Sequence, residues 1–155
     1  DGITLARAQL EGKDAEKILK EIKNNDNWKS LPLPKNIELV MYGGEKDSMM
    51  YESDLAEKLD MPKIQNGYWI FIDRYNNENR VTDGEELFPR YSANYTVGIY
   101  DAESNILYYC KYDSWAIYFV SRTDIWKGFF TFDWGATESF EDIVAEVLKK
   151  YIIWW

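Results

Sequence analysis

At 155 residues, the chain has the usual length of one domain and can bury a hydrophobic core without disulfides or a structural metal. Its 27 acidic and 18 basic residues give a net charge of -9, which argues against nucleic acid or an anionic membrane surface as a partner. Aromatic residues make up 17% of the sequence, yet no apolar run approaches the roughly 18 residues that a membrane-spanning helix needs. We therefore predict a single folded domain over residues 1–155, with no membrane-spanning segment.

Helical spacing dominates the N-terminal part of the chain. Apolar side chains recur every three or four residues from Leu5 to Ile22. This spacing predicts a helix over Ile3–Lys23, or a shorter helix capped by Asp14. Either helix would bury one apolar stripe against the rest of the domain.

An alternating pattern predicts the first strand. Ile37, Leu39 and Met41 occupy every second position, and Gly43-Gly44 then ends the run. Because successive side chains of a strand point to opposite faces, these three residues would share one face of a sheet.

A short helix and an interior strand follow. Ser53 can cap a helix that carries Leu55 and Leu59 and that ends before the next proline. The segment Tyr68–Arg74 then places large apolar side chains on both faces of a strand. A strand that is apolar on both faces belongs in the interior of a sheet, where both faces are covered.

A polar loop and a hairpin come next. Arg74–Arg90 is the most polar stretch of the chain and is expected to be a surface loop with at most one helical turn. Tyr95–Tyr100 and Ile106–Tyr112 are rich in β-forming residues and are joined by the short polar segment Asp101–Asn105. This arrangement predicts an antiparallel β-hairpin.

The C-terminal part is expected to add a second hairpin and a helix. Trp115–Val120 and Trp126–Phe132 would be the arms of the hairpin, although the first arm is also compatible with a helix. Ser139 can cap a helix whose apolar stripe runs from Phe140 to Ile152. The predicted fold class is therefore α+β, with an antiparallel sheet of about four to six strands flanked by an N-terminal and a C-terminal helix.

The sequence offers little conventional chemistry. It contains no histidine, so the commonest general base and the usual zinc ligand are missing. Gly43–Ser48 lacks the spacing of a phosphate-binding loop and is predicted to be a turn. Asp101, Glu103 and Asn105 alternate as in a calcium loop, but the glycine and glutamate that such a loop needs later are absent. We therefore assign no catalytic, cofactor-binding or metal-binding residue from the sequence.

Asp73 is the one acid whose predicted setting stands out. It would share a strand face with Trp69 and Phe71, and apolar surroundings of that kind raise the pKa of a carboxyl group. A pair of such acids would support glycoside hydrolysis. The interpretation that we favour is that Asp73 lies at the solvent-exposed end of the strand, beside Arg74.

Two features bear on the compartment. The single cysteine, Cys110, permits no internal disulfide, and its place on a predicted strand indicates a buried small hydrophobe. The sequence begins at Asp1 without a methionine, which favours a chain that has lost a signal peptide or an N-terminal anchor. We expect an extracytoplasmic protein, secreted or anchored, with a cytoplasmic location as the alternative.

Three functions remain open. The first is a non-enzymatic binding domain that meets a protein or glycan partner through aromatic and acidic surface. The second is an enzyme that uses only carboxylates, such as a small glycan-cleaving hydrolase with Asp73 or an acid of Asp83–Glu86. The third is an acidic intracellular protein that neutralises a basic target, as immunity proteins do. The tail Tyr151–Trp155 is either docked on the domain or an exposed interaction patch.

Overall fold

The computed structural model describes residues 2–75, 78–88, 90 and 93–114. Along this part of the chain the elements are β1 (Gly2–Gln9), α1 (Gly12–Asn24), β2 (Lys29–Ser30), α2 (Lys35–Tyr42), β3 (Gly44–Lys46), β4 (Met49–Tyr51), α3 (Leu55–Lys58), β5 (Gly67–Asp73), β6 (Arg80–Val81), β7 (Asn94–Asp101) and β8 (Ile106–Asp113). The predicted second hairpin, the C-terminal helix and the tail Tyr151–Trp155 lie outside the described residues.

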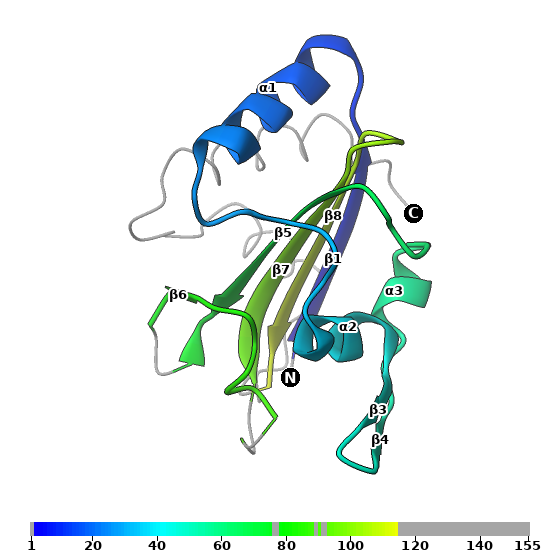
Figure 1. Ribbon diagram of the computed structural model, residues 1–155, viewed down its shortest axis with the longest axis vertical. Helices are drawn as coiled ribbons and strands as arrows, with labels where there is room; N and C mark the ends of the chain where they lie inside the picture. The colour runs from blue at the N-terminus through cyan, green and yellow to red at the C-terminus, as the bar shows by residue number, and fades with distance from the viewer. Residues whose placement is uncertain (1, 76–77, 89, 91–92, 115–155) are drawn as a thin grey trace.

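A six-stranded antiparallel sheet forms the centre of the fold (Figure 1). Its strand order is β1-β8-β7-β5-β2, and β6 also pairs with β5. β3 and β4 form a separate two-stranded sheet. Together with helices α1, α2 and α3 this is an α+β fold, so the predicted fold class is confirmed. In the part of the chain that the structure describes, no helix is both long and apolar enough to cross a membrane.

The predicted hairpin is formed by β7 and β8. The two strands pair from Asn94 opposite Asp113 to Asp101 opposite Ile106. Asp101 closes the turn, because one carboxylate oxygen accepts a hydrogen bond from the Glu103 N–H at 2.9 Å and the other accepts one from the Ser104 hydroxyl at 2.6 Å. Local hydrogen bonds therefore account for the polar residues of the turn.

The interior position predicted for Tyr68–Arg74 is also confirmed. β5 pairs with β7 on one side and with β2 and β6 on the other. Gly67 begins the strand where a β-carbon would clash with the Tyr100 carbonyl oxygen, so no other residue fits there without displacing the backbone. Phe71 is fully buried at the middle of the strand, and its truncation to alanine would cost about 3–5 kcal/mol.

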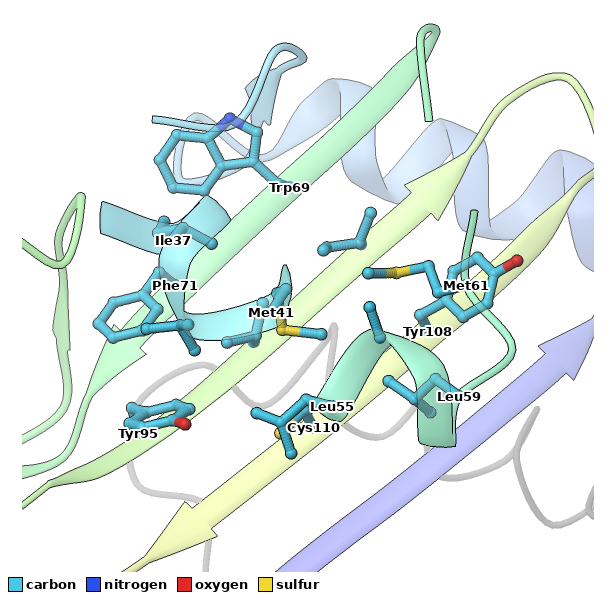
Figure 2. Packing of buried hydrophobic residues seen from close by; sticks show 14 of the residues in the cluster. Ile37, Met41, Leu55, Leu59, Met61, Trp69, Phe71, Tyr95, Tyr108 and Cys110 are labelled. Atoms are coloured by element: carbon cyan, nitrogen blue, oxygen red, sulfur yellow. The ribbon is translucent and has the colours of Figure 1, made fainter. Parts of the chain in front are cut away.

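Two hydrophobic clusters cover the two faces of the sheet. On one face, α1 contributes Ile18 and Ile22 to a cluster that includes Leu107 of β8. On the other face, α2 and α3 pack on side chains of β5, β7 and β8 (Figure 2). Members of this second cluster include Ile37, Met41, Leu55, Leu59, Met61, Trp69, Phe71, Tyr95, Tyr108 and Cys110.

Of the two helices predicted for this region, the long one over Ile3–Lys23 is wrong in its first half, and the shorter one is closer to the structure except for its cap. Gly2–Gln9 is strand β1, which pairs with β8 along its whole length. The helix begins only at Gly12, and Glu11 occupies the capping position that we predicted for Asp14. Alanine, leucine, arginine and glutamine favour helices locally, but pairing with β8 satisfies the backbone of this segment and outweighs that preference.

The strand predicted around Ile37 and Met41 is also wrong, because these residues belong to helix α2. Pro34 immediately precedes the helix, and Gly43 follows it with a φ of 68°. Proline at the start and glycine just past the end are boundary signals of a helix. Leu39, whose spacing suggested a strand, is buried as well, because the helix is covered on more than one side.

The short helix after Ser53 and the loop after β5 lie where the sequence placed them. α3 spans Leu55–Lys58, and Asp54 rather than Ser53 occupies its N-cap. The Ser53 Oγ accepts a hydrogen bond from the Leu55 N–H at 3.4 Å, and the Ser53 hydroxyl donates one to the Val40 carbonyl oxygen at 2.5 Å, which ties the start of α3 to α2. Between β5 and β7, the described residues form loops and turns apart from the short strand β6 and Tyr75, which has 3-10 helical geometry.

Candidate functional site

Asp73 lies in a buried ion-pair cluster at the end of β5. Its side chain is only 4% exposed, and Arg90 Nη1 donates to both carboxylate oxygens, at 3.0 and 2.8 Å. Arg80 Nη2 lies 3.3 Å from one oxygen, and the Tyr75 N–H donates to the other at 3.0 Å. The prediction that Asp73 lies at the solvent-exposed end of the strand, beside Arg74, is therefore wrong. The loop after β5 folds back and covers the carboxylate with two other arginines.

The acidic cluster Asp83–Glu86 also has structural roles. Glu86 bridges the two arginines of the ion-pair cluster, with Oε2 at 3.0 Å from Arg80 Nη2 and 2.8 Å from Arg90 Nη2. Asp83 accepts a hydrogen bond from the Glu85 N–H at 3.0 Å. These acids fix the loop, and the carboxylate of Asp73 has both oxygens engaged and little access to a substrate.

An open cavity of about 470 Å³ lies between α3 and the turn that joins β7 to β8. This volume is within the range of known ligand sites. The cavity brings together β1, α3 with the segment that follows it, and the β7–β8 turn, which are far apart in the sequence. Its lining residues are Arg7, Ala56, Glu57, Asp60, Met61, Pro62, Asp101, Ser104, Ile106 and Tyr108.

Negative charge prevails in this cavity. Among the described residues that line it, Arg7 is the only cationic one, and Arg7 Nη1 lies 2.7 Å from Asp60 Oδ2. Asp101 is held by the hydrogen bonds of the turn. Glu57 makes no side-chain ion pair or hydrogen bond with any residue that the structure describes. The cavity thus combines three carboxylates with one guanidinium, and one of the carboxylates has no partner within the described chain.

Tyr108 forms part of the inner wall of the cavity, next to Met61 (Figure 2). Tyr108 is only 2% exposed, so the face of its ring is not available for a ligand to stack on. The guanidinium carbon of Arg7 lies 6.0 Å from the ring centre. Burial raises the pKa of the Tyr108 hydroxyl, and the positive charge of Arg7 opposes that rise.

Cys110 lies in the hydrophobic cluster beneath α2 and α3, with Ile106 and Tyr108. Burial raises the pKa of its thiol to about 12. The prediction of a buried small hydrophobe is therefore confirmed, and the thiol has no thiolate character near neutral pH.

Sequence reasoning missed the cavity. Arg7 fell within a predicted helix, and neither Glu57 nor Asp60 differed from the other surface acids of the chain. The site exists only because β1 pairs with β8, which places Arg7 beside the segment that follows α3. No local pattern carries that information.

Neither a metal centre among the described residues nor a match to a known protein identifies a function for this chain. Among the described residues, no group of three or more acidic or cysteine side chains is arranged to hold a metal ion. Comparisons with models of known families, with curated proteins and with solved structures gave no match. The function is therefore inferred from the geometry and charge of the residues themselves.

Proposed function

We propose that the chain is a non-enzymatic binding domain for a protein partner, and that the cavity beside α3 receives a positively charged side chain of that partner. The supporting observation is the charge of the cavity, where three carboxylates meet one guanidinium. Glu57 is the carboxylate without a partner in the described chain, and it would pair with the incoming lysine or arginine. The net charge of -9 would attract a basic partner from a distance.

Two observations favour this proposal over the alternatives. A glycan site usually offers an exposed aromatic face, whereas Tyr108 is buried behind the cavity. A carboxylate-only hydrolase needs an acid that can reach its substrate, whereas Asp73 is enclosed by Arg80 and Arg90. A cationic group requires neither feature, because charge and hydrogen bonds supply its binding energy.

Titration with small ligands followed by NMR tests the proposal. Arginine and lysine amides with blocked N-termini should bind with dissociation constants in the range of about 1–10 mM, which corresponds to about -3 to -4 kcal/mol. Added salt should weaken binding, and the residues whose NMR chemical shifts change should lie around the cavity. Glu57→Gln should abolish binding of the cationic amides at the cavity. Glu16→Gln, on the exposed surface of α1, is the matched control and should leave that binding unchanged.

Three results would contradict the proposal. Binding of neutral oligosaccharides without binding of the cationic amides would favour a glycan partner. Turnover of an oligosaccharide would favour the hydrolase. Equal binding by the Glu57→Gln and Glu16→Gln variants would place the cation elsewhere on the acidic surface.

A further inference from the structure

A second surface feature is the methionine hairpin, which we define as residues 44–51, comprising β3, β4 and their turn. Met50 is 72% exposed and Met49 is 55% exposed, more than any other large hydrophobic residue that the structure describes. The turn between the strands has positive φ angles at Asp47 and Ser48. Figure 1 shows that the hairpin extends away from the central sheet and from α3.

The hairpin carries an apolar side chain on each face. Met50 pairs with Glu45, and Met49 pairs with Lys46. Residues directly opposite each other in an antiparallel pair share a face, and successive residues alternate between faces. The two methionines therefore lie on opposite faces of the hairpin, Met50 on the face of Glu45 and Met49 on the face of Lys46.

The inner face of the hairpin is fixed to the domain. Lys46 Nζ donates a hydrogen bond to Asn36 Oδ1 at 2.7 Å and lies 5.2 Å from the ring centre of Phe88. The ring of Tyr51 meets that of Phe88 edge to face, with their centres 4.8 Å apart. A hairpin that is braced along one face loses little conformational entropy when a partner binds its other face.

The charges on the hairpin and directly after it indicate the partner. Glu45, Asp47 and Glu52 are exposed and form no ion pair with any described residue. The single basic residue of the hairpin, Lys46, is directed toward Asn36 and Phe88. A second copy of this chain would bring acids against acids, whereas a surface rich in lysine or arginine would complement them.

We propose that the methionine hairpin inserts into an apolar groove, rimmed by lysine or arginine, on a basic protein partner. Methionine suits this role because its flexible thioether adapts to the shape of a groove. An exposed pair of large apolar side chains with an acidic border is typical of an interaction site rather than of ordinary surface. The inference rests on the proposed function in requiring a protein partner, but it uses a surface separate from the cavity.

Photo-crosslinking from the full chain tests this inference. A diazirine analogue of methionine is placed at position 50 and, as the control, at position 81, where Val81 is also an exposed apolar residue. In cells of the source organism, position 50 should form an adduct with one protein and position 81 should not. The purified partner should then bind Met50→Ser at least tenfold more weakly than the wild-type chain, and raised salt should weaken wild-type binding.

Several outcomes would overturn the inference. These are no adduct from position 50 above the level at position 81, an adduct with a second copy of the chain, or a partner that binds Met50→Ser as tightly as the wild type. Thermal unfolding of Met50→Ser should match that of the wild type, because the side chain is exposed. Loss of partner binding in Glu57→Gln alone would reject the hairpin and keep the cavity. Loss of partner binding in Met50→Ser, together with failure of the small cations to bind, would keep the hairpin and reject the cavity.

Discussion

The substitution Asp73→Asn separates a structural role of this residue from a catalytic one. It removes the negative charge between Arg90 and Arg80 but keeps the shape of the side chain. Asp73 and Arg90 are 4% and 14% exposed, so the variant leaves a guanidinium largely buried without its main counter-charge. Removing one partner of a buried ion pair costs about 3–5 kcal/mol.

We expect a loss near the lower end of that range, about 3 kcal/mol, for two reasons. Arg90 keeps Glu86 as a partner at 2.8 Å, and the asparagine oxygen can still accept one hydrogen bond. For a chain of this size, such a loss lowers the thermal midpoint by about 6–12 °C.

The assay is urea unfolding followed by circular dichroism, with thermal unfolding as a second measurement. Glu78→Gln is the matched control, because Glu78 is paired with Arg80 at 3.3 Å but is mostly exposed. Removing that surface pair should change stability by less than about 1 kcal/mol. If Asp73→Asn also falls within 1 kcal/mol of the wild type, the buried carboxylate does not hold the loop and the structural interpretation is wrong. Full stability combined with a lost hydrolytic activity would instead support the enzyme.

Three further predictions concern Lys111, Cys110 and Gly67. Burial, assisted by the nearby charge of Arg74, lowers the pKa of Lys111 from its ordinary 10.5 to about 8. Between pH 8 and 10.5 the unfolded chain therefore keeps a proton on Lys111 that the folded chain has lost. The contribution of Lys111 to the free energy of unfolding accordingly rises with pH across that range. Lys111→Met should remove that rise in urea titrations between about pH 8 and 9.5. The thiol of Cys110, with its pKa raised to about 12 by burial, should react with a disulfide reagent at pH 8 only when urea unfolds the chain. Gly67→Ala should cost at least about 2 kcal/mol, because its β-carbon would meet the Tyr100 carbonyl oxygen, whereas Gly2→Ala meets no atom within 4 Å and should be neutral in the same unfolding assay.

Local sequence patterns were sufficient where neighbours in the chain are also neighbours in the fold. The hairpin of β7 and β8 was predicted because its two strands flank a short polar turn, and Asp101 closes that turn with its own side chain. The interior position of β5 followed from apolar residues on both of its faces. These features depend on a few adjacent residues.

The errors arose where distant segments decide the structure or where two local signals disagree. Residues 3–9 favour a helix by composition, and only their pairing with β8 makes them a strand. Ile37 and Met41 alternate as in a strand, but the boundary signals of Pro34 and Gly43 proved the better guide. Asp73 was placed correctly at a strand end, yet its arginine partners come from a loop whose path the sequence does not reveal.

The pairing of β1 with β8 has a consequence for synthesis on the ribosome. The two strands are separated by roughly a hundred residues, so at about 5–20 residues per second β1 waits about 5–20 s for its partner to emerge. During that time it offers unpaired backbone and apolar side chains such as Leu5 to other chains, whereas β7 and β8 can join as soon as both are made. Of the described strands of this sheet, β1 is thus the first to be made and among the last to be paired.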